Sequence, residues 1–258
     1  MRSSRPPPRD EAGMGRENGM TPGVVIVSGT GTEIGKTVVT AAVAALARAR
    51  GVGVAVVKPA QTGVGPDEPG DVGEVARLAG PVHGVELARY PEPLAPATAA
   101  RRAGAPAVRP RDAADAVAKA AVEHGLVLVE GAGGLLVRFD DDGGTLADTA
   151  ALLDAPVLLV APAGLGTLNG VALTAEVLRA RGVGLLGVVV GSWPGCPDLA
   201  ARCNLTDLPA VAGAPLLGAV PEGAGGLSPA VFRRRAADWL APELGGRWDA
   251  AAFTAAAG

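Results

Sequence analysis

The feature that most constrains the fold of this chain is an apolar run that ends in a glycine-rich turn. Val24 to Val27 form the run, Ser28 to Gly35 form the turn, and Lys36-Thr37 open a helix-forming segment that continues to Arg50. This order is typical of a phosphate-binding loop, because glycines let backbone N–H groups point at a polyphosphate and the helix N-terminus adds partial positive charge. We expect Lys36 to reach the β- and γ-phosphates and the Thr37 hydroxyl to bind Mg²⁺.

The match to G-x-x-x-x-G-K-[ST] is imperfect. Thr30 stands where the first glycine is expected, with Gly29 and Gly31 on either side. The alternative interpretation is a strand–helix turn with an incidental lysine and no ligand. The order of strand, turn and helix, with Gly-Lys-Thr at the helix start, favours the phosphate loop.

The rest of the chain alternates apolar segments with helical ones. Further strands are predicted at 52–59, 126–129, 156–160, 185–190 and 215–220, and helices at 72–78, 111–123, 167–181, 199–210 and 229–240. The stretch 64–70 predicts a mobile loop, and the proline-dense stretch 90–96 predicts irregular structure. Near-continuous apolar strands separated by helices indicate one α/β domain of three layers, with a mostly parallel sheet covered by helices on both faces.

Polar residues at the ends of these strands are candidate site residues. Lys58 lies at the end of the second predicted strand, and Glu130 follows the apolar run Leu126 to Val129. Ligands of parallel α/β sheets bind beyond the carboxyl ends of the strands, so we expect Lys58 and Glu130 to face the phosphate loop. Glu130 has the position of the acid that orients Mg²⁺ in phosphate-loop enzymes. Asp71 is a further candidate, but the sequence alone does not separate it from three neighbouring acids, Asp67, Glu68 and Glu74.

Composition excludes several other functions. The formal net charge of −3 argues against a nucleic-acid partner. Cys196 and Cys203 lack metal-ligand spacing, and a reduced cytoplasmic compartment suits them. No apolar stretch reaches transmembrane length, so no membrane association is expected. Residues 1–22 are interpreted as a disordered N-terminal extension.

Four motifs together resemble the dethiobiotin synthetase family. They are Gly29 to Thr37, Lys58 to Gly63, Val129 to Gly134 and Gly164 to Asn169, and the resemblance covers about residues 24–237. It implies a P-loop NTPase-like fold, with residues 23–240 as the synthetase domain and 241–258 as a C-terminal tail. It also implies Mg²⁺, ATP as co-substrate, and 7,8-diaminononanoate (7,8-diaminopelargonic acid) and CO₂ or bicarbonate as substrates. The product would be dethiobiotin, formed by phosphorylation of a carbamate and closure of a ureido ring.

The same resemblance assigns roles to residues. Lys58 and Lys36 would be catalytic, and Thr37, Asp71 and Glu130 would surround Mg²⁺, which selects Asp71 from its neighbours. Substrate contacts would come from Thr32, Glu33, Thr62, Gly166, Thr167 and Asn169. Nucleotide contacts would come from Glu33, Ile34, Gly35, Lys36, Thr37, Val38, Asp71, Glu130, Gly131, Ala132, Gly133, Gly191, Ser192, Pro221, Glu222 and Gly223. The Gly164 to Asn169 segment would reach the diamine across a two-fold contact, which implies a homodimer.

One position departs from the family pattern. Gly191-Ser192 stand where many members carry an Asn-Asp pair whose Asn reads adenine. Trp193 is either a base-stacking residue or a packed turn aromatic. The segment from Tyr90 to Ala100 is a candidate lid.

Two other functions share the expected fold. A ParA/MinD-like switch ATPase would carry a lysine near Gly31, where this chain has none, and a C-terminal amphipathic membrane helix, for which the end is too short and too poorly charged. An amidating synthetase of the cobyrinic acid type would need a glutamine-cleaving domain, for which 258 residues leave no room.

Overall fold

The computed structural model describes residues 23–257, and the predicted N-terminal extension lies outside this range. Its strands are β1 Val24–Gly29, β2 Val54–Thr62, β3 His83–Tyr90, β4 Leu126–Gly134, β5 Val157–Ala161, β6 Leu185–Trp193 and β7 Leu216–Pro221. Its α-helices are α1 Lys36–Ala49, α2 Asp71–Ala79, α3 Pro96–Ala103, α4 Pro110–Glu123, α5 Leu146–Leu153, α6 Thr167–Ala180, α7 Leu199–Ala212, α8 Pro229–Arg235 and α9 Ala250–Ala257.

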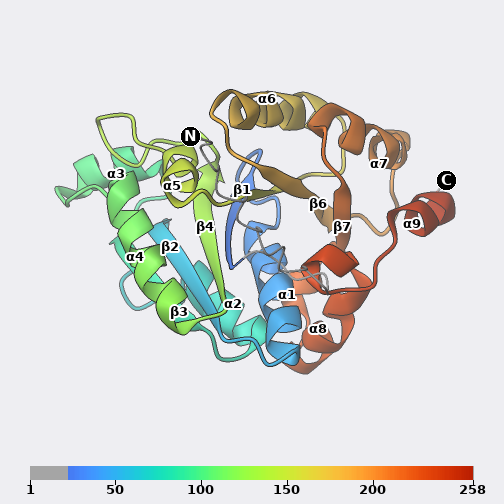
Figure 1. The fold of residues 1–258 in the computed structure, drawn as a ribbon, viewed down its shortest axis with the longest axis horizontal. Coiled ribbons are helices and arrows are strands. Elements are labelled where there is room, and N and C mark those ends of the chain that lie inside the picture. Colours follow the sequence, from blue (N-terminus) through green and yellow to red (C-terminus); the bar gives the residue numbers. More distant parts are fainter. Residues whose placement is uncertain (1–22, 258) are drawn as a thin grey trace, which may run out of the picture.

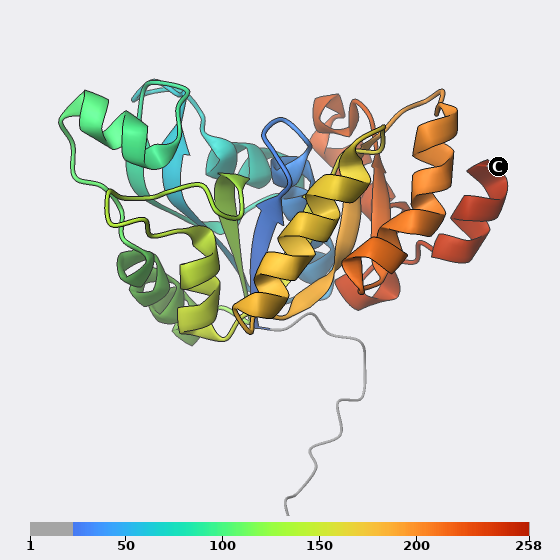
Figure 2. The ribbon, with the colours of Figure 1, turned by 90° about the horizontal axis from the view of Figure 1, so that it is seen from above.

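The strands of the described chain form one parallel sheet in the order β3-β2-β4-β1-β5-β6-β7. Helices α1, α2 and α8 pack together on one side of the sheet, and α4 to α7 cover the other side (Figure 1; Figure 2). The predicted three-layer α/β fold is therefore confirmed.

Burial explains why the sequence pattern was readable. In the central strand β1, Val25 and Val27 pack into the core on one face and Ile26 into the core on the other, all fully buried. A strand that is buried on both faces has no polar alternation, which is why it appears in the sequence as a continuous apolar run.

The register of β2 matters for the site. Residues Val54 to Val57 pair with β4, ending at Val57 against Val129, whereas Lys58 to Thr62 pair only with β3. The pairing of β2 with β4 ends at Val57, and just beyond this point Lys58 Nζ lies 3.1 Å from the carboxylate of Glu130. Both residues therefore lie inside their strands rather than after them, because each strand continues further than its apolar run.

Three predictions about local structure were wrong. The edge strand β3 was missed because its residues are mostly half-buried and do not form an apolar run. The proline-dense stretch is regular at both ends, since Tyr90 closes β3 and Pro96 opens α3 at a first-turn position where proline is tolerated. The last predicted helix stops at Arg235, continues as a 3₁₀ turn Ala236–Asp238, and is followed by α9.

The C-terminal segment packs on the domain. Leu244 and Trp248 are buried in the main core. The ring of Phe253 in α9 packs edge-on against Trp193 and at a tilt against Trp248, each at a ring-centroid distance of 5.3 Å. Trp193 is thus a packed aromatic, which agrees with the second of the two interpretations of this residue.

Candidate active site

The site is built first by the phosphate loop between β1 and α1. Gly35 has φ 93°, a left-handed conformation that suits glycine, and Glu33 adopts φ 57° in the same turn. A non-glycine residue in this region is uncommon and costs strain of order 1 kcal/mol, which a loop keeps only where the surrounding structure demands it. Lys36 curls back over the turn, and its Nζ donates to the Gly31 carbonyl oxygen at 2.7 Å.

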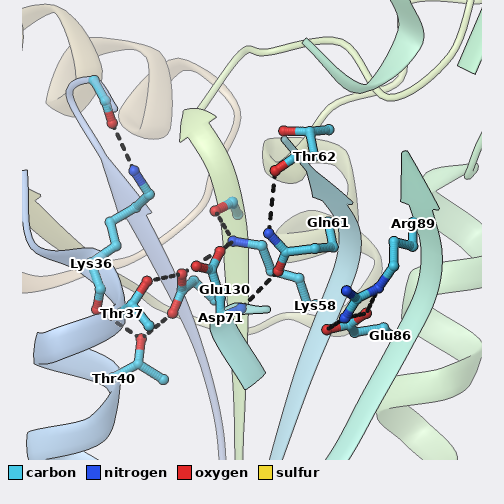
Figure 3. Close-up of polar contacts among 12 residues, drawn as sticks. Lys36, Thr37, Thr40, Lys58, Gln61, Thr62, Asp71, Glu86, Arg89 and Glu130 are labelled. Atoms are coloured by element: carbon cyan, nitrogen blue, oxygen red, sulfur yellow. Dashed lines mark hydrogen bonds and ion pairs between the residues drawn. The ribbon is translucent and has the colours of Figure 1, made fainter. Parts of the chain in front are cut away.

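A second set of side chains meets around the carboxylate of Glu130 (Figure 3). Its Oε1 accepts hydrogen bonds from Thr37 Oγ1 at 2.8 Å and from Lys58 Nζ at 3.1 Å, and its Oε2 accepts one from Thr40 Oγ1 at 2.8 Å. Glu130 is 1% exposed and Lys58 3% exposed. A buried carboxylate requires such partners, because an unpaired charge in a low-dielectric interior is very unfavourable.

Lys58 bridges two carboxylates. Its Nζ forms ion pairs with Glu130 and with Asp71, and it also donates to the Gly131 carbonyl oxygen at 3.1 Å. Burial on its own lowers the pKa of Lys58, but the charges of Glu130 and Asp71 outweigh it, so the pKa is raised above 10.5. Lys58 is therefore a permanent cation at physiological pH.

The second lysine has the opposite electrostatic setting. Burial, followed by the positive charge of Lys58, lowers the pKa of Lys36 below 10.5. The negative charges of Glu130 and Asp71 oppose this shift without cancelling it. Lys58 is neutralised by two carboxylates, whereas Lys36 has no carboxylate in direct contact, so Lys36 is the lysine whose charge is best placed to meet a polyanion.

Most of the predicted site residues line one cavity of about 850 Å³. They are Thr32, Glu33, Gly35, Lys36, Thr37, Val38, Lys58, Thr62, Asp71, Glu130, Gly131, Ala132 and Gly133. The carboxyl ends of β1, β2 and β4 thus meet at the same opening, as the strand-end argument predicts.

The remaining predicted residues do not line this cavity: Ile34, Gly166, Thr167, Asn169, Gly191, Ser192, Pro221, Glu222 and Gly223. The start of α6 comes close to the phosphate loop, since a Cβ placed on Gly170 would lie 3.3 Å from Cβ of Thr30. The loop after β7 comes close to α1, since a Cβ on Gly225 would lie 3.2 Å from Val38 Cγ2. The roles of these residues stay predictions.

Gly191 has a packing reason to be glycine. A Cβ at this position would lie 2.0 Å from the Ile34 carbonyl oxygen, and one on Gly35 would lie 2.3 Å from the Gly191 carbonyl oxygen. The phosphate loop and the end of β6 therefore touch backbone to backbone. In this arrangement no side chain fits at residue 191.

Sequence reasoning missed several residues of the site. The cavity is also lined by Gln61, Gly63, Val64, Pro93, Leu94, Ala95, Pro96 and Val137. Thr40 does not line the cavity, but its hydroxyl donates a hydrogen bond to Glu130. Thr40 could have been found, because it follows Lys36 by four residues and so lies on the same helix face. Residues Pro93 to Pro96 belong to the segment proposed as a lid.

The donor set suits Mg²⁺. Thr37, Asp71 and Glu130 offer only oxygen ligands, which hard cations prefer, and magnesium commonly takes one or two carboxylates with substrate phosphates and water completing its shell. Among residues 23–257 no group of three or more His, Cys, Asp and Glu side chains has the geometry of a complete metal site. The protein ligands present fit a metal that arrives with a nucleotide.

The parallel sheet, the glycine-rich loop and the two lysines at the cavity are typical of one class of protein, the P-loop nucleotide-binding proteins. The family model described as an AAA domain matches residues 24–225. A ParA family ATPase from Chlorobium tepidum has a TM-score of 0.53 at 13% identity, covering 83% of this chain and 90% of that one. The MinD cell division ATPase of Pyrococcus furiosus has a TM-score of 0.52 at 19% identity, covering 83% and 97%. These likenesses show the fold alone.

Closer relatives define the family within that class. The protein named ATP-dependent dethiobiotin synthetase BioD of Streptomyces avermitilis is 71% identical over 90% of this chain and 98% of its own length. The protein of the same name from Saccharopolyspora erythraea is 70% identical over 87% and 98%. The chain belongs to the ATP-dependent dethiobiotin synthetase family.

None of the helices within residues 23–257 combines the length and the apolar character needed to cross a lipid bilayer.

Proposed function

We propose that this protein is an ATP-dependent dethiobiotin synthetase of biotin biosynthesis, a ligase that forms C–N bonds in the cytoplasm. The observation that carries the proposal is the convergence of Lys36, Lys58, Asp71 and Glu130 on one cavity beside the phosphate loop. Family membership supplies the substrates, which are 7,8-diaminononanoate, CO₂ and ATP.

The reaction has three steps. One amine nitrogen of the diamine attacks CO₂, an N–C bond forms, and a proton leaves to give a carbamate. A carbamate oxygen then takes the γ-phosphoryl group of ATP as the β,γ P–O bond breaks and ADP departs. The second amine attacks the carbamoyl carbon, the C–O bond to phosphate breaks, and the ureido ring closes with loss of a proton.

The residues of the chain match the charge that develops in these steps. Lys58 is cationic, buried and fixed by Glu130 and Asp71, so it is suited to hold the carbamate oxygens beside the γ-phosphate. Lys36 is placed at the phosphate loop to neutralise the transferred group. Phosphoryl transfer asks a protein mainly for positioning and charge stabilisation, which two fixed ammonium groups supply.

Mg²⁺ fits the same arrangement. Thr37, Asp71 and Glu130 are the residues that would hold it, and when bound with the nucleotide it would neutralise phosphate charge. Lys58 lies between the two carboxylates and balances their charge. The same two carboxylates would then serve both as partners of Lys58 and as ligands of Mg²⁺.

A homodimer is part of the proposal. Leu165, just before α6, is 92% exposed, and Leu173 in α6 is 56% exposed. Leu165 lies in the turn before the helix, and the exposed Asn169 and Leu173 lie four residues apart on one outer face of α6. A second copy of the chain covering this face would bring the Gly164 to Asn169 segment towards the diamine.

The test is diamine-dependent phosphate release with ATP, Mg²⁺ and bicarbonate. The Lys58→Ala variant is expected to lose turnover by about 10²- to 10³-fold, the scale of removing one preorganised oxyanion partner. Nucleotide affinity should be largely kept, because Lys36 and the phosphate loop remain. The exposed Lys119, changed to alanine, is the matched control.

Two outcomes would contradict the proposal. Phosphate release that ignores the diamine but responds to a protein partner would favour a switch ATPase. Normal turnover in Lys58→Ala would remove Lys58 from the mechanism.

A further inference from the structure

Arg89 of β3 lies outside the cavity but holds the loop that leads to Asp71. Its Nη1 donates to the carbonyl oxygens of Gly65 at 2.9 Å and Glu68 at 2.7 Å. Its Nε and Nη2 donate to the carboxylate of Glu86 at 2.7 to 3.0 Å. The guanidinium thus uses its whole planar fork, which fixes its orientation as well as that of the loop.

Gln61 links the same region to Asp71. The N–H of Asp71, the first residue of α2, donates to Gln61 Oε1 at 2.8 Å, and Gln61 itself is 4% exposed. The residue before α2 is Gly70, which offers no side chain to cap the helix. The side chain of Gln61 in β2 therefore acts as the N-terminal cap of α2, because it accepts a backbone N–H at the start of the helix.

Gly70 is the point where these groups meet. A Cβ on this residue would lie 2.7 Å from Gln61 Oε1, 2.7 Å from Glu86 Oε1 and 3.0 Å from Arg89 Nη2. The backbone just before Asp71 therefore packs directly against three side chains. We call these three, Gln61, Glu86 and Arg89, the Arg89 cluster (Figure 3).

We propose that Arg89 is a positioning residue for the reaction, which fixes the carboxylate of Asp71 against Lys58 by holding the 65–70 loop down on Gln61 and Glu86. This inference rests on the proposed function. Without Arg89, the carbonyls of Gly65 and Glu68 would turn to water, and the loop would no longer set where α2 begins. Asp71 is about one-third exposed, so its own burial does little to hold it in place.

The consequence is a specific effect on metal and catalysis. Asp71 is a proposed ligand of Mg²⁺ and a partner of Lys58, and outer residues that orient a ligand typically change metal affinity or activity by about 10- to 100-fold. Arg89 does not line the cavity, so its loss should leave the contacts of the diamine unchanged.

The experiment compares Arg89→Met with Arg77→Met. Arg77 is the matched control because it also pairs with a glutamate three residues earlier, Glu74, and donates to a backbone carbonyl, that of Gly225 at 2.6 Å. Arg77 lies in the same helix as Asp71, but in its last turn. Three quantities are measured: Mn²⁺ affinity in the presence of a non-hydrolysable ATP analogue, hydrogen exchange of the Asp71 amide, and kcat with KM for the diamine.

For Arg89→Met we expect about tenfold weaker Mn²⁺ binding or more, faster exchange of the Asp71 amide, and a kcat lowered by 10- to 100-fold at nearly unchanged diamine KM. Arg77→Met should stay within about twofold of the unmodified protein, as is usual for exposed ion pairs. Equal behaviour of the two variants would overturn the proposal.

Two milder variants keep the inference testable if Arg89→Met does not fold. Arg89→Lys keeps the charge but loses the fork, and Glu86→Gln keeps the shape but loses the charge. Arg89→Lys with Mn²⁺ affinity and Asp71 exchange like those of the unmodified protein would overturn the role. Failure of the unmodified protein to turn over the diamine would refute the proposed function instead, and the Mn²⁺ and exchange measurements would still decide what Arg89 does.

Discussion

Individual residues in this site are set by their electrostatic neighbours more than by their type. Lys36 and Lys58 are both buried lysines near the same carboxylates, but their pKa values move in opposite directions. Lys58 contacts Glu130 and Asp71 directly, whereas Lys36 bonds to the Gly31 carbonyl and feels the positive charge of Lys58. Direct contact with an anion therefore explains why the pKa of Lys58 is raised and that of Lys36 is lowered.

This difference predicts a pH dependence. Lys36 is proposed to bind phosphate as a cation, and its pKa in the free protein is lowered, so its charge is lost as pH rises through a value below 10.5. The alkaline fall of kcat/KM for ATP, which reports the free enzyme, should begin below the range of an ordinary lysine. Lys58 does not produce this fall, because its pKa is raised. The measurement is a kcat/KM profile over alkaline pH.

The control is Lys36→Arg, whose guanidinium stays charged over that range. The alkaline fall should move to higher pH in this variant even if its activity is lower. An unchanged alkaline fall in Lys36→Arg would show that another group causes it.

At the scale of elements, the short helix α9 packs near a segment that is proposed to contact the nucleotide. Phe253 packs on Trp193 at the end of β6, and the Trp193 carbonyl oxygen accepts the N–H of Glu222 at 2.8 Å. The C-terminal helix is thus connected, through one aromatic contact and one backbone hydrogen bond, to the proposed nucleotide loop Pro221 to Gly223.

We expect Phe253→Ala to lower the free energy of unfolding by about 2 kcal/mol, less than for a fully buried phenylalanine because Phe253 is half-buried. It should also raise KM for ATP several-fold while KM for the diamine stays the same. Urea unfolding and steady-state kinetics measure the two effects. Val122→Ala, at a residue 84% exposed on α4, is the control. A stability loss without any change in KM for ATP would limit α9 to a structural role.

At the scale of the whole molecule, the proposed dimer would complete the site. Of the two exposed leucines, Leu165 lies within the segment predicted to reach the diamine, and Leu173 follows it in α6. Single exposed leucines are common on protein surfaces, so these two become informative only together with their position.

The double variant Leu165→Asp with Leu173→Asp should shift the protein from dimer to monomer in sedimentation velocity, because two buried charges oppose association. KM for the diamine should rise about tenfold or more, while ATP affinity should change little, since the phosphate loop lies within one chain. Leu199→Asp, at a residue 69% exposed on α7, is the control. A fully active monomer of the unmodified protein would contradict the dimer.

The sequence by itself determined the parallel sheet, the phosphate loop and the edge at which Lys58 and Glu130 would meet. Strands buried on both faces must be apolar throughout, and the glycine-rich turn must precede the helix. Both features therefore produce a pattern that can be recognised in a short stretch of sequence. The half-buried edge strand β3 produces no such pattern, and neither does the helix start at Pro96.

Only the tertiary structure decided how the charged groups are held. Three features of the site involve segments distant in sequence. The pairing of β2 with β4 ends at Val57, Thr40 donates to Glu130, and Gln61, Glu86 and Arg89 meet next to Gly70. Such contacts depend on strand register and on where loops return to the sheet. A hydrophobic pattern specifies which faces of the strands and helices are buried. Which polar groups become hydrogen-bond partners depends on how these elements lie after their apolar faces have packed.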